Sequence, residues 1–194
     1  MIVFPYKIKL IGGSINSIAL GDLNNDGLKD FVTGNDTSNN ISVIISSANN
    51  FFNTQNNYTV GKHDYNVIIS DLNNDKLLDI ITTNAGDNSV SVLIGNGSGS
   101  FQNQKNYYTD TLPYVTNVTD INGDGIKDLV VSCTNQISIL IGNGDGTFKS
   151  KFSVPYGINQ QSFSYSLAVT DFNNDGYNDL ALANVYDSNA VSYT

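Results

Sequence analysis

Four short stretches of the chain carry aspartate and asparagine at a spacing suited to binding a hard cation. The clearest is the segment 120–128, which has Asp, Asn, Asp and Asp at its positions 1, 3, 5 and 9. Carboxylate and amide oxygens are the ligands that Ca²⁺ prefers in proteins. Gly125 at position 6 permits a sharp turn with positive φ between them. The segment therefore predicts a cation-binding loop.

The same pattern occurs at 22–30, 71–79 and 171–179, so its first residue recurs after 49, 49 and 51 residues. A spacing this regular indicates a structural repeat. The candidate side-chain ligands are Asp22, Asn24, Asp26, Asp30, Asp71, Asn73, Asp75, Asp79, Asp120, Asn122, Asp124, Asp128, Asp171, Asn173, Asp175 and Asp179.

An alternative interpretation is that these stretches are Asx-rich turns that need no metal, because Asn and Asp favour turns by themselves. Chance would give one such pattern in an Asn-rich chain, but not four at one period. Three carboxylates held close together also repel one another when no cation is present. The second copy has Lys76 where the others have Gly, so we expect it to be the weakest site or to remain empty.

The amino-acid composition is consistent with cation-binding loops and with a β-rich fold. All 18 acidic residues are Asp, all nine basic residues are Lys, and Asn occurs 29 times. Twelve of the 18 Asp belong to the four loops, and four divalent cations would change the net charge from −9 to −1. An acidic chain without Arg is a poor candidate for binding nucleic acid. The scarcity of helix formers and abundance of turn formers favour strands and loops.

The residues around each loop predict four strands per repeat. Short apolar runs precede and follow the loop. A third segment follows, as in 41–45, 90–94 and 137–141, and its alternation of apolar residues with Ser predicts a half-buried strand. A glycine-rich turn ends it, and an aromatic stretch suggests the fourth strand. Four strands in about 49 residues is the content of one β-propeller blade.

We therefore expect an all-β fold, a β-propeller of four-stranded blades with about four blades present. The approximate repeats are 13–61, 62–110, 111–157 and a truncated 158–194, with 1–12 as the end of a preceding blade. Because open sheet edges would be left at both ends, we interpret the chain as part of a longer propeller. A closed ring of four blades is the alternative.

The Asp-x-Asn-x-Asp-Gly-x-x-Asp loop, the apolar pair after it and the Gly-Asn-Gly-Asp-Gly-Thr-Phe turn at 142–148 resemble the FG-GAP, or VCBS-type, repeats of integrin α-subunit propellers and many secreted proteins. The resemblance covers the whole chain. It implies up to four bound Ca²⁺ ions, an extracellular or cell-surface location, and a role in adhesion. It also implies that backbone carbonyls at position 7 complete the sites, which here belong to Leu28, Leu77, Ile126 and Tyr177.

An EF-hand is excluded, although its calcium loop begins in a similar way. An EF-hand requires a bidentate Glu at position 12 and flanking helices. The residues at position 12 here are Thr33, Thr82, Val131 and Leu182, and the flanks have the pattern of strands.

Catalysis and membrane insertion have little support in the sequence. The only His is His63, next to Asp64, and Cys133 lies in a strand pattern that suggests a small buried residue. No apolar run approaches the roughly 20 residues needed to span a membrane, and no signal peptide is visible at the N-terminus. We expect a protein that is not an enzyme.

Three hypotheses about function remain open. The first is a non-enzymatic, calcium-stabilised propeller segment that binds a protein or glycan ligand, as adhesion and lectin-like proteins do. The second is an accessory propeller of a secreted hydrolase or lyase whose catalytic domain lies outside this chain. The third is a cytoplasmic scaffold that needs no calcium.

Overall fold

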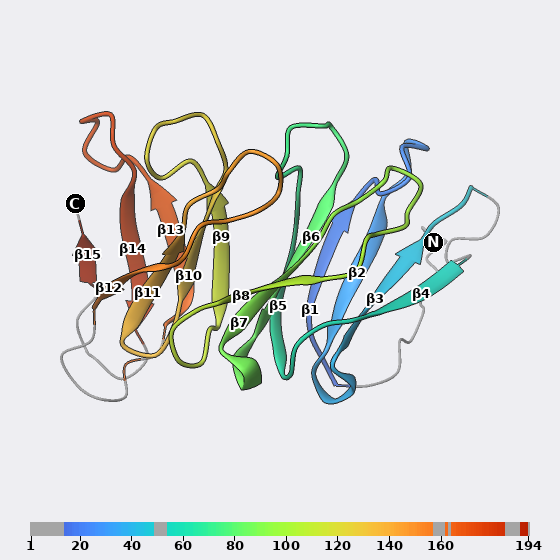
Figure 1. The fold of residues 1–194 in the computed structure, drawn as a ribbon, viewed down its shortest axis with the longest axis horizontal. Helices are drawn as coiled ribbons and strands as arrows, with labels where there is room; N and C mark the ends of the chain where they lie inside the picture. Colours follow the sequence, from blue (N-terminus) through green and yellow to red (C-terminus); the bar gives the residue numbers. More distant parts are fainter. Residues whose placement is uncertain (1–13, 49–53, 157–161, 163, 185–190, 194) are drawn as a thin grey trace, which may run out of the picture.

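The computed structural model describes residues 14–48, 54–156, 162, 164–184 and 191–193, and these form antiparallel sheets joined in chain order (Figure 1). The predicted strand at 1–12 lies outside the described residues. The strands are β1 (Ile15–Gly21), β2 (Asp30–Asn35), β3 (Asn40–Ile45), β4 (Thr54–Thr59), β5 (Asp64–Ser70), β6 (Asp79–Asn84), β7 (Ser89–Leu93), β8 (Lys105–Tyr108), β9 (Val115–Thr119), β10 (Asp128–Ser132), β11 (Gln136–Leu140), β12 (Phe152–Pro155), β13 (Ser164–Thr170), β14 (Asp179–Asn184) and β15 (Val191–Tyr193), and two 3₁₀ helices are η1 (Asp36–Ser38) and η2 (Ala85–Asp87).

Each repeat forms its own sheet, with strands that neighbour one another in sequence order. Sheet 1 is β1-β2-β3-β4, sheet 2 is β5-β6-β7-β8, sheet 3 is β9-β10-β11-β12, and sheet 4 contains β13-β14-β15 among the described residues. Every Asp-rich loop joins the first two strands of a sheet. The predicted all-β class, the strand–loop–strand setting and the four-stranded repeat are therefore confirmed, the last of these in sheets 1 to 3.

Among the described residues, the hydrophobic core consists of three clusters, each lying between two consecutive sheets. Between sheets 1 and 2, for example, Val32 and Val43 pack with Val67, Ile80 and Leu93. Equivalent clusters lie between sheets 2 and 3 and between sheets 3 and 4. The first strands also contact one another, since β1 lies beside β5, β5 beside β9 and β9 beside β13. A sheet in the middle of the row is thus buried on both faces.

The third strands differ from the sequence-based expectation of a half-buried strand. Their central serines, Ser42, Ser91 and Ser138, are at most 1% exposed, so both faces of each third strand are buried at this point. Each buried hydroxyl is hydrogen bonded: Ser42 Oγ accepts from Asn35 Nδ2 at 2.8 Å, and Ser91 Oγ accepts from Asn84 Nδ2 at 2.8 Å. The serine side chains therefore join strands within each sheet.

Aromatic pairs connect consecutive sheets at equivalent places. Tyr58 of β4 meets Phe101 edge to face at 5.6 Å between ring centroids, and Tyr107 of β8 meets Phe148 at 5.3 Å. The recurrence of Phe after the glycine-rich turn thus reflects packing, and its counterpart Phe52 lies outside the described residues.

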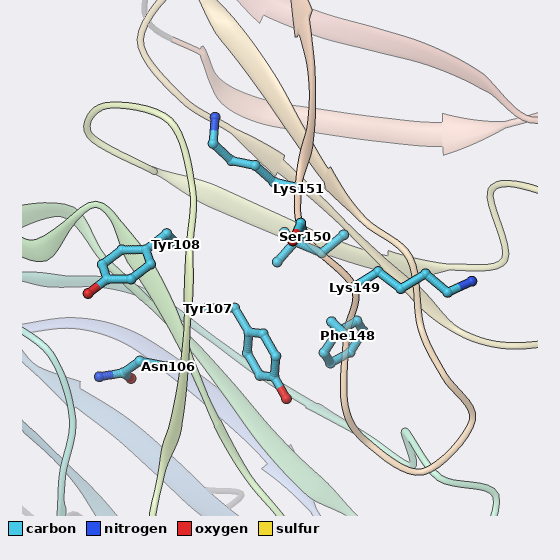
Figure 2. A pocket seen from close by; sticks show the side chains of 8 residues that line it. Asn106, Tyr107, Tyr108, Phe148, Lys149, Ser150 and Lys151 are labelled. Carbon is cyan, nitrogen blue, oxygen red and sulfur yellow. The ribbon is translucent and has the colours of Figure 1, made fainter.

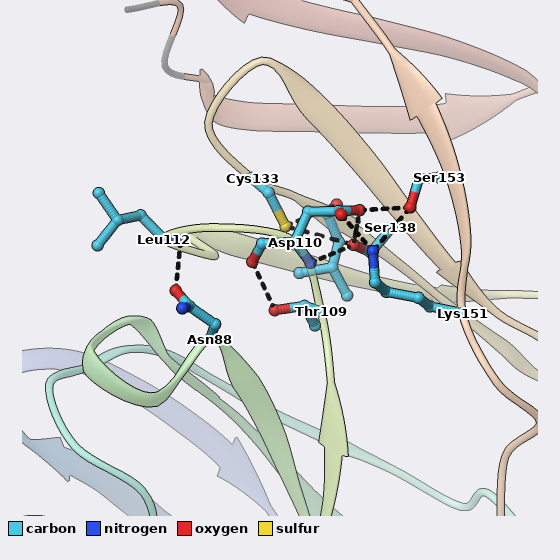
Figure 3. A network of polar contacts seen from close by, with 9 residues as sticks. Asn88, Thr109, Asp110, Leu112, Cys133, Ser138, Lys151 and Ser153 are labelled. Atoms are coloured by element: carbon cyan, nitrogen blue, oxygen red, sulfur yellow. Dashed lines mark hydrogen bonds and ion pairs between the residues drawn. The ribbon is translucent and has the colours of Figure 1, made fainter.

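Sheet 3 replaces the neutral side-chain network of sheets 1 and 2 with a charged one (Figure 3). Cys133 stands where the other sheets have Asn, and Asp110 stands where sheet 2 has Gly61. Asp110 accepts hydrogen bonds from Ser138 and Ser153, both at 2.7 Å, and from the Lys151 ammonium. The side chains of Asp110 and Lys151 are 16% and 29% exposed.

The two residues that differ between sheets 2 and 3 are sterically matched within each sheet. A Cβ atom at Gly61 would lie 2.5 Å from Asn84 Cγ, so a side chain there is incompatible with that Asn. Cys133 is smaller, and its sulfur lies 3.6 Å from Ser138 Oγ. The smaller residue at 133 leaves room for the carboxylate of Asp110.

Replacing Asp110 with Asn is expected to destabilise the fold by about 2 kcal/mol at neutral pH, because Lys151 loses a charge-assisted bond. Burial raises the pKa of Asp110, but hydrogen bonds from Lys151, Ser138 and Ser153 together lower it below its ordinary value. This stabilisation is thus present above the unfolded-state pKa of about 3.9 and is lost as the pH falls through the lower folded-state pKa. Urea unfolding at pH 7 and pH 3 measures the difference.

The matched control converts the cluster to the residues of sheet 2, with Asp110→Gly, Cys133→Asn, Lys151→Gln and Ser153→Asn combined. We expect this variant to be more stable than Asp110→Gly alone, because a complete neutral network leaves no unpaired charge. Equal stability of wild type and Asp110→Asn at pH 7 would contradict the importance of the pair.

Candidate metal loops

The four Asp-rich stretches lie along the same edge of the row of sheets, at the top of Figure 1. We name them loop 1 (22–30), loop 2 (71–79), loop 3 (120–128) and loop 4 (171–179). Each begins at the end of the first strand and ends at the first residue of the second strand. The sheet edge therefore presents four copies of one loop, and positions within each are numbered from 1 to 9.

Side-chain oxygens at positions 1, 3 and 5 accept hydrogen bonds from backbone amides of the same loop, as loop 3 illustrates. Asp120 Oδ2 accepts from the amide of Gly125 at 2.8 Å, and Asp124 Oδ1 accepts from the amide of Ile126 at 2.8 Å. Asn122 accepts from the Asp124 amide through Oδ1 and donates to Asp124 Oδ2 through Nδ2, both at 2.9 Å. These four contacts recur in loops 1, 2 and 4.

The aspartate at position 9 is buried at the base of the loop. Asp30, Asp79 and Asp128 are fully buried, and Asp179 is 4% exposed. In every loop its Oδ2 atom accepts from the amide of position 2, at 2.8 to 3.0 Å. This carboxylate therefore fixes the start of the loop to its end.

In sheets 1 to 3 the other oxygen of position 9 reaches the end of the third strand. Asp30, Asp79 and Asp128 accept there from the amides of Ser46, Gly95 and Gly142, at 2.8, 2.9 and 2.7 Å. A Cβ atom on Gly95 or on Gly142 would lie 2.2 Å from a carbonyl oxygen of the loop. A side chain at either place would therefore require the backbone to shift, whereas the equivalent residue of sheet 1 is Ser46.

The carboxylates at positions 1 and 5 affect the pKa of the buried carboxylate at position 9 in loops 1 and 2. Burial raises the pKa of Asp30, and the neighbouring charges of Asp26 and Asp22 raise it further against two amide hydrogen bonds. The pKa of Asp79 is raised in the same way. By contrast, the amide of Gly125 lowers the pKa of the exposed Asp120. Added positive charge near Asp30 or Asp79 would therefore reduce the part of the pKa increase that comes from the neighbouring carboxylates.

The donor set of the loops fits a hard cation. All candidate side-chain donors are oxygens, which suits Ca²⁺ rather than a metal that prefers sulfur or nitrogen. In loop 2, Asp71 Oδ1 is buried and has no hydrogen-bond donor in the described part of the chain. The described residues contain no group of three acidic, His or Cys side chains arranged to surround a metal ion.

The backbone of each loop has positive φ at two positions, 4 and 6. Position 6 has φ of 84°, 68°, 81° and 90° in loops 1 to 4, and the 68° belongs to Lys76. Position 4 is occupied by Asn25, Asn74, Gly123 and Asn174, with φ from 58° to 76°. The positive φ at position 4 was not predicted from the sequence, although Asn or Gly occupies this position in every copy.

The Lys76→Gly variant is expected to stabilise the protein by about 1 kcal/mol. Lys76 keeps the left-handed conformation of the other loops, which costs about 1–2 kcal/mol for a residue with a Cβ atom, and greater freedom of the unfolded chain offsets part of the gain. Urea unfolding in chelator measures the effect without metal. Lys29→Gly is the control, because Lys29 is not among the positive-φ residues and its replacement should destabilise. A less stable Lys76→Gly protein would contradict the strain at position 76.

The residues predicted to supply position 7 carbonyls have different side-chain surroundings. Leu77 and Ile126 pack against Gly97 and Gly144 in the turn that follows the third strand of their own sheet. Leu28 is half-buried, and Tyr177 is 76% exposed. Tyr177 is therefore suited as a spectroscopic reporter within loop 4.

The surroundings of His63 and Cys133 do not suggest catalysis, and the predicted burial of Cys133 is confirmed. His63 Nδ1 lies 2.9 Å from Asp36 Oδ1 of η1, so its imidazole contacts a residue of sheet 1. Cys133 is fully buried, and burial raises the pKa of its thiol to about 11. The thiol is thus protonated at neutral pH and is a poor nucleophile.

Grooves lie between consecutive sheets, outside the aromatic pairs. One groove of about 310 Å³ is lined by residues of β8 and of the connection before β12 (Figure 2). In Figure 2, Tyr107 points toward Phe148, while Tyr108 and Asn106 point to the other side of the strand. An equivalent groove of about 370 Å³ lies beside Tyr58. The grooves thus repeat with the sheets.

The family model described as "FG-GAP-like repeat" matches residues 22–82 and 120–182, well over half of the chain. A search of the curated proteins gave no significant match. None of the helices among the described residues is long and apolar enough to cross a membrane.

Solved structures share the fold at low sequence identity. One is an Agrocybe aegerita lectin that recognises non-reducing terminal N-acetylglucosamine, with a TM-score of 0.59 and 22% identity over 84% of this chain and 45% of the lectin. Another is the Photorhabdus luminescens Tc holotoxin pore, with a TM-score of 0.50 and 17% identity over 90% of this chain and 9% of that chain. The chain thus spans less than half the length of either structure.

Proposed function

Because the chain belongs to the FG-GAP-like repeat family, we propose that it is a calcium-stabilised β-propeller segment that binds a protein or glycan ligand and is not an enzyme. The four sheets would be blades of a larger propeller, with β1, β5, β9 and β13 as the inner strands. An extracellular or cell-surface location goes with this proposal, since calcium modules of extracellular proteins have dissociation constants of about 10⁻⁴ to 10⁻³ M.

The observation that carries the proposal is the identical folding of four separate loops. In each loop, side-chain oxygens of positions 1, 3 and 5 accept hydrogen bonds from backbone amides of the loop, and the carboxylate at position 9 is buried at its base. Ca²⁺ would be held by these side chains and by the position 7 carbonyl, and it would supply positive charge where carboxylates now repel one another. Loop 2 would bind most weakly, because Lys76 adds a positive charge beside its site.

The ligand-binding part of the proposal is supported by the repeated grooves and by the shared fold with a lectin. Grooves of about 300 Å³ are at the lower end of the range for small-molecule sites, which suits a single sugar or one side chain of a protein. Their lining combines aromatic rings with amide and hydroxyl groups. We therefore expect several weak and similar contacts rather than one deep site.

Terbium luminescence tests calcium binding directly. Tb³⁺ replaces Ca²⁺ in oxygen sites and emits when a nearby aromatic ring is excited; the chain has no Trp, so Tyr must transfer the energy. We expect emission that rises with added Tb³⁺ and falls with excess Ca²⁺. Tyr177→Leu is the matched variant, since loops 1 and 2 have Leu at position 7. It should lose much of the emission while binding the same number of ions.

The absence of bound Tb³⁺ and of any response to Ca²⁺ would refute the metal part of the proposal. Emission that is insensitive to excess Ca²⁺ would show that the ions bind elsewhere on this acidic surface.

A further inference from the structure

The residue at position 8 of a loop contacts the preceding sheet next to the preceding loop. Asn178 of loop 4 donates through Nδ2 to the carbonyl oxygen of Asp120 at 2.7 Å. Asp120 is position 1 of loop 3, so this bond joins two loops 58 residues apart in the sequence. The bond is partly buried.

Position 8 makes a contact at the equivalent place in loops 3 and 2, but the type of interaction differs. Lys127 of loop 3 donates through Nζ to Ser70 Oγ at 3.0 Å, directly before loop 2. Leu78 of loop 2 lies against Gly21, directly before loop 1, where a Cβ atom would come within 2.8 Å of Leu78 Cδ1. Position 8 of loops 2, 3 and 4 thus contacts either the preceding loop or the residue directly before it.

From these contacts we propose that position 8 is a positioning residue for the metal site of the preceding loop, and that calcium binding in consecutive loops is coupled. This inference rests on the proposed calcium binding. Asn178 lies between the position 7 carbonyl and the position 9 carboxylate of loop 4, so an ion there restricts its backbone on both sides. The restricted Asn178 then holds Asp120 in place as a ligand of loop 3.

The coupling is strongest between loops 3 and 4 for a physical reason. Asn178 is short and bonds to the backbone of a ligand residue, so little side-chain freedom remains between the two sites. Lys127 has a long, flexible side chain and bonds to the residue before a ligand, and Leu78 makes only an apolar contact. By linkage, an ion in loop 3 must favour an ion in loop 4 by the same factor.

The test follows the affinity of loop 3 through the amide signal of Gly125 during a Ca²⁺ titration monitored by NMR. The variant Asp175→Asn weakens the site in loop 4. The variant Asn178→Leu removes the hydrogen bond to Asp120 but keeps a side chain of similar size, and Leu is the residue at position 8 of loop 2. We expect each variant to weaken calcium binding in loop 3 about fivefold, the effect of one hydrogen bond. The double variant should be no weaker than either single variant, because both interrupt the same connection.

Two further measurements separate coupling from a general loss of stability. Lys29→Ala changes position 8 of loop 1, which has no preceding loop among the described sheets, and it should leave the affinity of loop 3 unchanged. In chelator, Asn178→Leu should speed hydrogen exchange of the Gly125 amide, which bonds to Asp120, more than that of Gly27 in loop 1.

The outcomes distinguish this inference from the proposed function. Calcium binding in loop 3 that is unaffected by Asp175→Asn would overturn the coupling and leave calcium binding intact. Effects of Asp175→Asn and Asn178→Leu that multiply in the double variant would also overturn it. A Gly125 signal that does not respond to Ca²⁺ would refute the proposed metal binding, and the coupling with it.

Discussion

Chelation of calcium is expected to lower the melting temperature of this protein by about 10–20 °C. At roughly 1 mM Ca²⁺ and a dissociation constant near 0.1 mM, each site contributes about 1.4 kcal/mol to the free energy of unfolding. Four sites then contribute about 5 kcal/mol, with loop 2 supplying less than its share. In a domain of this size each kcal/mol corresponds to about 2–4 °C. Calorimetry in calcium and in chelator measures the shift.

Magnesium is the control for this prediction. Mg²⁺ prefers a tight octahedral shell with several retained waters, so it should restore less of the melting temperature than Ca²⁺ at the same concentration. A melting temperature that is the same in chelator and in calcium would show that the loops are Asx-rich turns without bound metal. It would also favour a scaffold that needs no calcium.

The Asp128→Ala variant is expected to lose about 3–5 kcal/mol of stability even in chelator. Asp128 is fully buried and accepts from the amides of Ile121 and Gly142. Its removal leaves two amides without their acceptor, at about 1–3 kcal/mol each, and creates a cavity in a packed region. Urea unfolding in chelator isolates this structural role from any role in binding metal.

Asp124→Ala is the matched control within the same loop. Asp124 is exposed, so in chelator its loss should cost under about 1 kcal/mol, and further loss should appear only in calcium. Asp128→Asn should be intermediate, because the amide oxygen accepts from one backbone amide but not from both. If Asp124→Ala and Asp128→Ala are equally stable in chelator, position 9 is not the structural anchor described above.

Much of the local structure could be predicted because it depends on neighbours in sequence. Apolar runs on both sides of 120–128 predicted two strands, and β9 and β10 lie there. Gly at position 6 predicted positive φ, and Gly27, Gly125 and Gly176 have it. The third strands were predicted as half-buried, and this was wrong for Ser42 and its counterparts, because alternation within one strand does not reveal how many sheets will cover it.

The sequence alone determined the repeat, the position of each loop between two strands, and the oxygen chemistry of the loops, since the period and residue types are local properties. Only the tertiary structure decided what the loop residues contact beyond their own loop. Asp128 reaches Gly142, Asn178 reaches Asp120, and Asp110 pairs with Lys151. These residues are brought together by the packing of sheets, whose spacing is set by side chains throughout the core. The position 9 aspartate, first regarded as one ligand among four, is therefore also the group that holds the loop to its sheet.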